Sequence, residues 1–390
     1  MKIKPKLLLL PALAFALAFS IPAAPASAAK SASEVQIQIT FSNGLDITGS
    51  AISKAQIKNG VSYMPASLVK IAGIEIAWNN SSKTASFTGW NKSFQVKLGS
   101  ISGVLDGNKI SLDGAPYMYN KELYVPAKFL AKAMEGGPVV WDPAAKTLLL
   151  NRLHMYRSYS ETYEGQVYSL SLDSGELYVT SKQNKKTRLA TLGYGLDLVD
   201  FTFERTPAGL TLLQISNNYG EPHIHVEYYS YLLKNGSILR QGHTDFHTTF
   251  GEAAVWADGK LVMNDRQTLR LIEDGTCAVA ETIDLPELLG TSVTRDVYYN
   301  VEAVYPDVLL VRPSNNAFLT LVNRSTGEQT LLYKELLNPS RQQQVEQPDS
   351  MFPGDYLYLI KRDGDVFTFK ARNMVNGKDE VYTYTLAGTE

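Results

Sequence analysis

The order of apolar and polar positions in residues 61–88 returns in residues 122–150. Each copy starts with a short strand that ends at a proline. A helix with one apolar face follows, and then two strands around an Asn- or Asp-led turn. One such β-α-β-β unit is too small to bury its own apolar face, so we expect the two units to pack together. The residues that mark the repeat are Tyr63, Pro65 and Trp78 in the first copy, and Tyr124, Pro126 and Trp141 in the second.

From residue 155 onward the pattern changes to many short segments with the period-two alternation of strands. Turn signals such as Asn235-Gly236 and Asp363-Gly364 separate them, and only residues 285–290 and 333–344 indicate helix. Hairpins return at irregular intervals of roughly 40–50 residues, which is the length of a propeller blade. We therefore predict an all-β domain at residues 155–390, with a β-propeller-like fold of about five blades. A pair of β-sandwiches is the structural alternative.

The first 28 residues have the pattern of a secretory signal peptide. Three lysines fall within the first six residues, an apolar run covers residues 7–21, and Ala26-Ser27-Ala28 offers a cleavage site. This run is shorter than the roughly 20 residues of a membrane span, and no later stretch is apolar enough to span a membrane. We expect an exported protein that is soluble after cleavage, with residues 29–34 as a short linker. An uncleaved N-terminal anchor is the alternative.

Charge and cysteine content narrow the function further. Removing the three lysines lowers Lys plus Arg from 37 to 34 against 39 acidic residues, so the mature net charge is −5. A negative chain without a long basic cluster argues against nucleic-acid binding. Cys277 is the single cysteine, which excludes an intramolecular disulfide. We expect it to serve as a small hydrophobic residue on a strand.

Residues 35–151 resemble the copper amine oxidase N-terminal-like domain, often called a stalk domain, which is common in exported proteins of Gram-positive bacteria. The resemblance is carried by "SYMPASLVKIAG" and "IAWN" in the first unit, and by "ELYVPAKFLAKAM" and "VVWDPAAKTLLL" in the second. Met64 and Ser67 depart from the residues usual in the family. The resemblance implies an α+β stalk module that acts as a spacer or attachment element and contains no oxidase chemistry.

The histidines and tyrosines do not support copper amine oxidase activity, which we reject. Such an enzyme needs three histidine ligands and a tyrosine within an Asn-Tyr-Asp/Glu motif, whereas Tyr219 is followed by Gly220. A smaller metal site would draw on His223, His225, His243 and His247. Regular pairing across the Asn235-Gly236 turn places the first two on one face and the last two on the other. A four-histidine site would require a bulge, so we predict no metal and no cofactor.

Tyrosines are the candidate ligand-binding residues of the second half. Aromatic side chains exposed on strands can stack against sugar rings, although tyrosine is also a common strand residue that packs at sheet surfaces. The candidates are Tyr228, Tyr229, Tyr231, Tyr298 and Tyr299. The chain contains neither a Gly-x-Ser-x-Gly elbow nor a phosphate-binding glycine loop, so we assign no catalytic residue.

These observations predict a non-catalytic exported protein of the cell envelope, secreted and associated with the cell wall. The stalk module would hold a propeller-like domain that binds a glycan or a protein partner. One alternative is a secreted polysaccharide hydrolase or lyase with carboxylates in the propeller cleft. Another is a regulator or inhibitor of a second exported enzyme. Clustered carboxylates and aromatic residues at one mouth of the propeller would favour the enzyme, and an open apolar face would favour protein binding.

Overall fold

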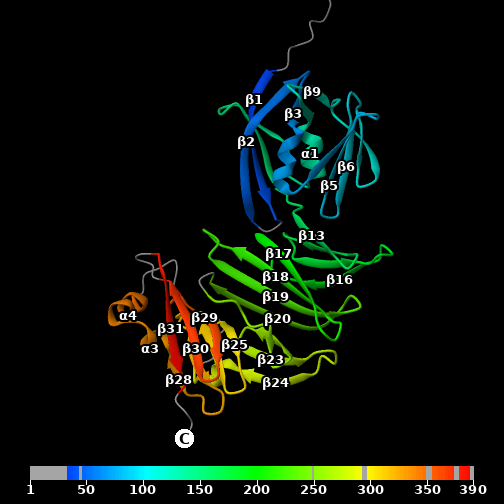
Figure 1. Ribbon diagram of the computed structural model, residues 1–390. Helices are drawn as coiled ribbons and strands as arrows, with labels where there is room; N and C mark the ends of the chain where they lie inside the picture. The colour runs from blue at the N-terminus through cyan, green and yellow to red at the C-terminus, as the bar shows by residue number, and fades with distance from the viewer. Residues whose placement is uncertain are drawn as a thin grey trace, which may run out of the picture.

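The computed structural model describes two domains joined at residues 155–157 (Figure 1). The predicted signal peptide lies outside the described residues, and residues 33 and 34, predicted as linker, belong to the first strand. No helix among the described residues is long and apolar enough to cross a membrane. The described residues are 33–43, 46–247, 250–291, 297–347, 354–372 and 377–386.

The N-terminal domain, residues 33–154, is called the stalk domain below. It contains a seven-stranded sheet, a five-stranded sheet and two short helices. The seven-stranded sheet has the order β11 (Val140–Asp142), β12 (Thr147–His154), β1 (Ser33–Ser42), β2 (Ile47–Lys58), β3 (Val61–Pro65), β10 (Glu122–Pro126), β9 (Tyr117–Tyr119). The five-stranded sheet runs β4 (Glu75–Asn79), β5 (Thr84–Gly89), β6 (Lys92–Lys97), β7 (Ser102–Leu105), β8 (Asn108–Ser111).

The two repeated units meet through their first strands. β3 and β10 pair antiparallel, with Tyr63 opposite Pro126 and Tyr124 opposite Pro65, so each repeated Tyr faces the other unit's Pro. Both predicted helices are present, but the first, η1 (Ala66–Ala72), is a 3-10 helix, and the second is α1 (Ala127–Ala133). The last two strands of the units lie in different sheets, β4 and β5 in one and β11 and β12 in the other. The repeated units therefore form the centre of the domain, where β3 pairs with β10, but they do not form two equivalent halves.

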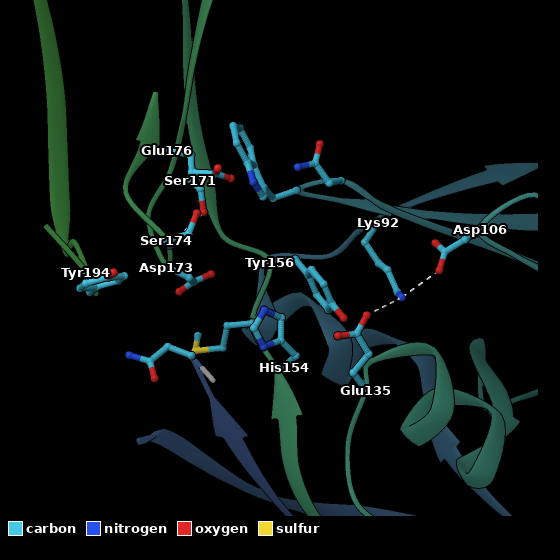
Figure 2. Close-up of a pocket in the computed structure, with 14 residues that line it drawn as sticks. Lys92, Asp106, Glu135, His154, Tyr156, Ser171, Asp173, Ser174, Glu176 and Tyr194 are labelled. Carbon is cyan, nitrogen blue, oxygen red and sulfur yellow. Dashed lines mark hydrogen bonds and ion pairs between the residues drawn. The ribbon is translucent and has the colours of Figure 1, made fainter. Parts of the chain in front are cut away.

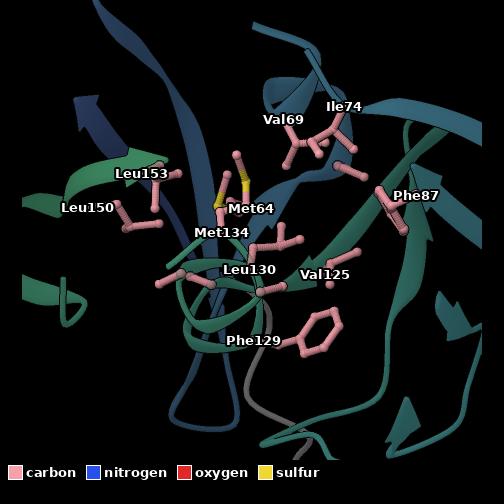
Figure 3. Close-up of a cluster of buried hydrophobic side chains, with 14 of the residues drawn as sticks. Met64, Val69, Ile74, Phe87, Val125, Phe129, Leu130, Met134, Leu150 and Leu153 are labelled. Atoms are coloured by element: carbon pink, nitrogen blue, oxygen red, sulfur yellow. The ribbon is translucent and has the colours of Figure 1, made fainter. Parts of the chain in front are cut away.

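The core of the stalk domain lies between the two sheets and the helices (Figure 3). Met64 and Val125 are fully buried and stand opposite each other at the β3–β10 pairing, where Val69 and Leu130 of the two helices join them. The repeated tryptophans, Trp78 and Trp141, are both 42% exposed and lie outside this core. Other core residues are Ile74, Phe87, Phe129, Met134, Leu150 and Leu153.

Five small antiparallel sheets follow one another along the second domain, which confirms the predicted propeller-like fold of about five blades. Blade 1 is β13 (Ser158–Tyr163), β14 (Gln166–Ser171), β15 (Glu176–Thr180), β16 (Lys186–Thr191). Blade 2 is β17 (Leu198–Arg205), β18 (Thr211–Tyr219), β19 (His225–Lys234), β20 (Ser237–His247). Blade 3 is β21 (Trp256–Ala257), β22 (Lys260–Asp265), β23 (Thr268–Glu273), β24 (Val279–Asp284).

Blades 4 and 5 are the last two sheets of the described residues, and the short helices lie before and between them. Blade 4 is β25 (Tyr299–Val304), β26 (Val308–Pro313), β27 (Thr320–Asn323), β28 (Gln329–Leu331). Blade 5 has three described strands, β29 (Leu357–Asp363), β30 (Val366–Arg372) and β31 (Asp379–Thr385). The helices that the sequence indicated correspond to α2 (Leu285–Leu288), α3 (Leu332–Leu336) and α4 (Pro339–Glu346).

Consecutive blades share apolar cores. Blades 1 and 2, 2 and 3, 3 and 4, and 4 and 5 each contribute to one buried cluster. No buried cluster of the described residues joins blade 5 to blade 1. Cys277 belongs to the cluster of blades 2 and 3, but it lies in the turn before β24 with a positive φ of 58°, so the predicted strand position is wrong.

A buried ionic network connects blades 4 and 5. The guanidinium of Arg312, on β26, donates to Glu302 on β25 and to Asp355 just before β29, both at 2.6 Å. It also donates to the carbonyl oxygens of Ala317 and Leu357, each at 2.7 Å. Arg312 and Asp355 are completely buried. These four hydrogen bonds and two carboxylates stabilise the guanidinium in the interior, because they compensate its charge and four of its five N–H donors.

The junction between the domains is held by backbone hydrogen bonds. Tyr156 donates to the carbonyl of Ala72 at 2.7 Å and accepts from the amide of Trp90 at 3.1 Å, so the linker lies between two stalk segments. The side chain of the next residue, Arg157, binds Asp173 of blade 1. Its Nη2 and Nε donate to Asp173 Oδ1 at 2.8 and 3.0 Å. This double attachment fixes the direction in which blade 1 leaves the stalk domain.

Replacing Arg312 should destabilise the propeller-like domain. Arg312→Met leaves two buried carboxylates without a cation, so the free energy of unfolding should fall by about 3–5 kcal/mol in urea denaturation. Arg205→Met is the matched control, because Arg205 pairs with Glu164 where both side chains are half-exposed. The control should change stability by less than about 1 kcal/mol. Similar losses for the two variants would contradict a structural role of the Arg312 network.

Replacing Gly73 should loosen the junction. An added Cβ would lie 2.6 Å from the Cα of Arg157, and Gly73 has a φ of 76°. Gly60 has nearly the same φ, 77°, with no atom within 4 Å of the added Cβ, so Gly60→Ala isolates the backbone strain. We expect Gly73→Ala to cost about 1–3 kcal/mol more than Gly60→Ala in thermal unfolding, and to speed proteolysis near residues 155–157. Equal behaviour of the two variants would show that the close approach is unimportant.

Candidate functional site

A cavity of about 710 Å³ lies at the junction, between the stalk domain and blade 1 (Figure 2). Its stalk side is formed by Trp90, Lys92 and Glu135, and its blade 1 side by Ser174 and Tyr194. The β5–β6 turn carries Trp90, β6 carries Lys92 and the turn after α1 carries Glu135, while the turn after β14 and the loop after β16 position the blade 1 residues. This volume is typical of small-molecule sites, which often form where two domains meet.

The charged part of the cavity centres on Lys92. Its Nζ lies 2.9 Å from Asp106 Oδ2 and 2.9 Å from Glu135 Oε1, as the dashed lines in Figure 2 show. Burial opposes the charge of Lys92, but the bonds to the two carboxylates outweigh burial and raise its pKa. The bond from Lys92 in turn lowers the pKa of Glu135. One ammonium faces two carboxylates, so the cluster keeps a net charge of −1 at neutral pH.

Two hydroxyl groups that line the cavity are buried without a hydrogen-bond partner, those of Tyr156 and Ser174. Tyr156 is only 6% exposed, and burial together with the nearby charge of Glu135 raises its pKa, so its hydroxyl stays protonated. The Glu135 carboxylate is near Tyr156 without meeting the geometry of a hydrogen bond. Buried polar groups are rarely left unpaired, but both hydroxyl oxygens have almost no accessible surface, so a polar ligand or water reaches them only if neighbouring side chains shift.

Aromatic rings form two walls of the cavity. Trp90 packs on Tyr178 of blade 1, with ring centroids 5.8 Å apart, and Lys186 lies over both rings. Tyr194 is 73% exposed and lies at the end of the cavity away from Lys92 (Figure 2). Trp90 is therefore fixed by its neighbours, whereas Tyr194 offers a ring that the fold itself does not use.

The five tyrosines predicted to bind a ligand do not form one exposed aromatic surface in the structure. Tyr229, Tyr231 and Tyr299 are buried, because the sheets that carry them are covered on that face by a neighbouring blade. Tyr228 is half-buried and stacks on Phe246, on the opposite face of blade 2 from Tyr229. Ligand binding by Tyr228 and by Tyr298, which is also half-buried, stays a prediction.

A bulge changes the predicted arrangement of the histidines. The pairing of β19 with β20 shifts between Leu232 and Leu233, so His225 pairs with His247, with ring centroids 5.8 Å apart. The expectation that these two lie on opposite faces is therefore wrong. His243 pairs with Tyr229, and His223 precedes β19 and contacts Asp197 at 3.0 Å. Among the described residues, no three His, Cys, Asp or Glu side chains are placed to hold a metal ion.

The same corrected register places two carboxylates side by side on blade 2. Glu227 pairs with Asp245 across β19 and β20, and Tyr219 donates to Asp245 at 2.5 Å. Burial raises the pKa of Asp245. Burial also opposes the charge of Glu227, but interactions with His243 and the amide of Asn217 outweigh it and lower the pKa of Glu227. Neighbouring acids whose pKa values are pushed apart are a common arrangement in hydrolytic sites.

Sequence reasoning missed the cavity because its residues come from both domains. Trp90 lies in the β5–β6 turn, which reads as an ordinary hairpin tip. Tyr194 stands between Gly193 and Gly195, and this was the available signal, since an aromatic residue flanked by glycines in a loop is not a packing position. Glu135, just after α1, has a positive φ of 53°, and no local sequence pattern predicts this backbone conformation.

Comparison with known proteins identifies the first of the two domains. Residues 45–150 match the family described as the copper amine oxidase N-terminal domain. Among curated proteins, none matches the chain. Solved structures with some likeness include virginiamycin B lyase from Staphylococcus aureus, with 10% identity, a TM-score of 0.21, and coverage of 83% of this chain and 87% of that one. Apo AztD from Citrobacter koseri has 12% identity, a TM-score of 0.27, and coverage of 88% and 90%.

TM-scores this low carry no argument about the second domain, whose propeller-like character rests on its own succession of five sheets. The family match, by contrast, covers the repeat, the β3–β10 pairing and both helices of the first domain. The chain therefore carries a copper amine oxidase N-terminal domain at residues 45–150, followed by a propeller-like domain.

Proposed function

We propose that this protein is a non-catalytic binding protein of the cell envelope that holds a glycan in the cavity between the stalk domain and blade 1. The observation that carries the proposal is the pair of unpartnered buried hydroxyls, Tyr156 and Ser174, in a cavity with an exposed aromatic ring, Tyr194. A sugar presents hydroxyls to polar groups and the flat face of its ring to aromatic side chains.

Other ligand classes fit the cavity less well. An apolar ligand would leave both hydroxyls without a partner, whereas a polyhydroxylated ligand could supply one to each. A phosphorylated or otherwise anionic ligand would face the net negative cluster of Lys92, Asp106 and Glu135. A neutral or cationic polyhydroxylated ligand has neither disadvantage.

Export and envelope association complete the proposal. They are supported by the lysines, apolar run and small residues of the first 28 positions. The rigid attachment of blade 1 to the stalk domain through Tyr156 and Arg157 suits a module that presents a binding site at a fixed distance from its anchorage.

The paired carboxylates of blade 2 favour one second candidate, a secreted polysaccharide hydrolase. Asp245, with its raised pKa, would protonate the glycosidic oxygen, and the ionised Glu227 would accept a proton from the attacking water. Both acids and Tyr219 lie on one face of the sheet. Neither acid forms an ion pair with Lys or Arg in the described part of the chain.

Replacing Tyr194 should weaken glycan binding without unfolding the protein. We expect the chain from Ala29 to co-sediment with peptidoglycan or an insoluble polysaccharide, and Tyr194→Ala to bind about five- to tenfold more weakly because one stacking surface is lost. Tyr119→Ala is the control, since Tyr119 is an exposed stalk tyrosine outside the cavity. Unchanged binding of Tyr194→Ala would remove the cavity as the site, and failure of the parent chain to sediment would remove the glycan proposal.

The second candidate predicts activity that depends on blade 2. Under it, release of new reducing ends from a polysaccharide should fall at least about 100-fold in Asp245→Asn and in Glu227→Gln, because each replacement removes one proton-transfer group. Glu204→Gln, on the opposite face of blade 2, should retain the activity. Binding without any release of reducing ends would leave the non-catalytic function and exclude the hydrolase.

A further inference from the structure

We infer that the glycan bound in the junction cavity carries a free, protonated amino group, and that the carboxylate of Glu135 receives it while the Tyr156 hydroxyl bonds to a neighbouring sugar hydroxyl. The inference rests on the proposed function and narrows its ligand to amino sugars.

The charge of the cavity points to a cationic group. Lys92 brings one positive charge to two carboxylates, and among the described residues it forms the only Lys or Arg ion pair with them, although His154 also lines the cavity near Glu135. Asp106 already accepts the amide of Ser93 with its other oxygen, at 3.3 Å. Glu135 binds Lys92 through Oε1 only, and its side chain is 61% exposed. Glu135 is therefore the carboxylate that can accept a further donor from a ligand.

Glu135 is ionised over a wide pH range because the hydrogen bond from Lys92 lowers its pKa. Hydrogen bonds between ionised partners are roughly twice as strong as neutral ones. A protonated amine on the ligand would thus be bound at the same pH at which the carboxylate is charged.

Tyr156 supplies the second, independent observation. Its hydroxyl is buried, lacks a hydrogen-bond partner, and lines the same cavity beside Glu135 (Figure 2). A simple amine would satisfy Glu135 and leave this hydroxyl unpaired. A sugar whose amino group has a hydroxyl on the adjacent carbon can satisfy both groups at once.

Two other kinds of sugar are disfavoured by the same residues. A uronic acid would bring a carboxylate against the negative cluster around Lys92. An N-acetylated sugar is neutral, so it forfeits the charge-assisted bond to Glu135 and adds a methyl group beside a polar wall. The structure thus separates two ligands that differ only by an acetyl group.

Oligomers of glucosamine and of N-acetylglucosamine of equal length provide the test. Calorimetry with the chain from Ala29, at a mildly acidic pH and low salt, should show the free-amine oligomer binding about tenfold or more tightly. Glu135→Gln should abolish this preference and leave binding of the N-acetylated oligomer within about twofold of the parent. Glu75→Gln, which replaces an exposed stalk glutamate outside the cavity, should change neither affinity.

The outcomes separate the inference from the function it rests on. Equal affinities, or tighter binding of the N-acetylated oligomer, would overturn the amino-sugar inference while the glycan-binding function stands. Binding of neither oligomer, or of any other glycan, would overturn both. A preference that survives in Glu135→Gln would overturn the role of Glu135. Tyr156→Phe, which keeps the ring and removes the hydroxyl, should weaken both oligomers, and unchanged affinities would exclude the second contact.

Discussion

The backbone of Tyr156 is the point on which the arrangement of the two domains depends. Its amide and its carbonyl are both bonded to the stalk domain, and the next residue holds Asp173 of blade 1. Hydrogen bonds of this kind leave little freedom to a linker, because each lost bond in a buried segment must be replaced. The cavity has walls from both domains, so it exists only while this short segment keeps its conformation.

The charge clusters around Arg312 and around Lys92 have different roles. Arg312 is surrounded by carboxylates and carbonyls that use four of its five N–H donors, and the side chains of this network are at most 3% exposed. Lys92 is also buried, with 6% of its side chain exposed, but the two acids that hold it reach into an open cavity. The first arrangement is closed and structural. The second leaves unused hydrogen-bonding capacity, which is the property that a binding site requires.

The sequence predicted the elements well because local patterns determine them. The Pro65 and Pro126 strand ends, the two helices and the Asp-Gly and Asn-Gly turns each follow from a few neighbouring residues. The sequence-based prediction failed where one extra residue shifts the pairing of two strands. Leu239 is the extra residue on β20, and it brings His225 of β19 opposite His247. The cavity could not be predicted from the sequence either, because no local pattern links Trp90 to Tyr194 or indicates that both line one cavity.

The succession of blades has a consequence for how the molecule responds to stress. Each blade shares an apolar core with the next, and no described cluster returns from blade 5 to blade 1. Blades 2 and 4 are also in direct contact, through a smaller buried cluster that includes Phe246 and Ala317, so coupling can pass between them without blade 3. Fraying that begins at blade 5 must cross at least three of the described interfaces, 5–4, 4–2 and 2–1, before it reaches blade 1. The junction cavity thus lies beside blade 1, several buried interfaces away from blade 5.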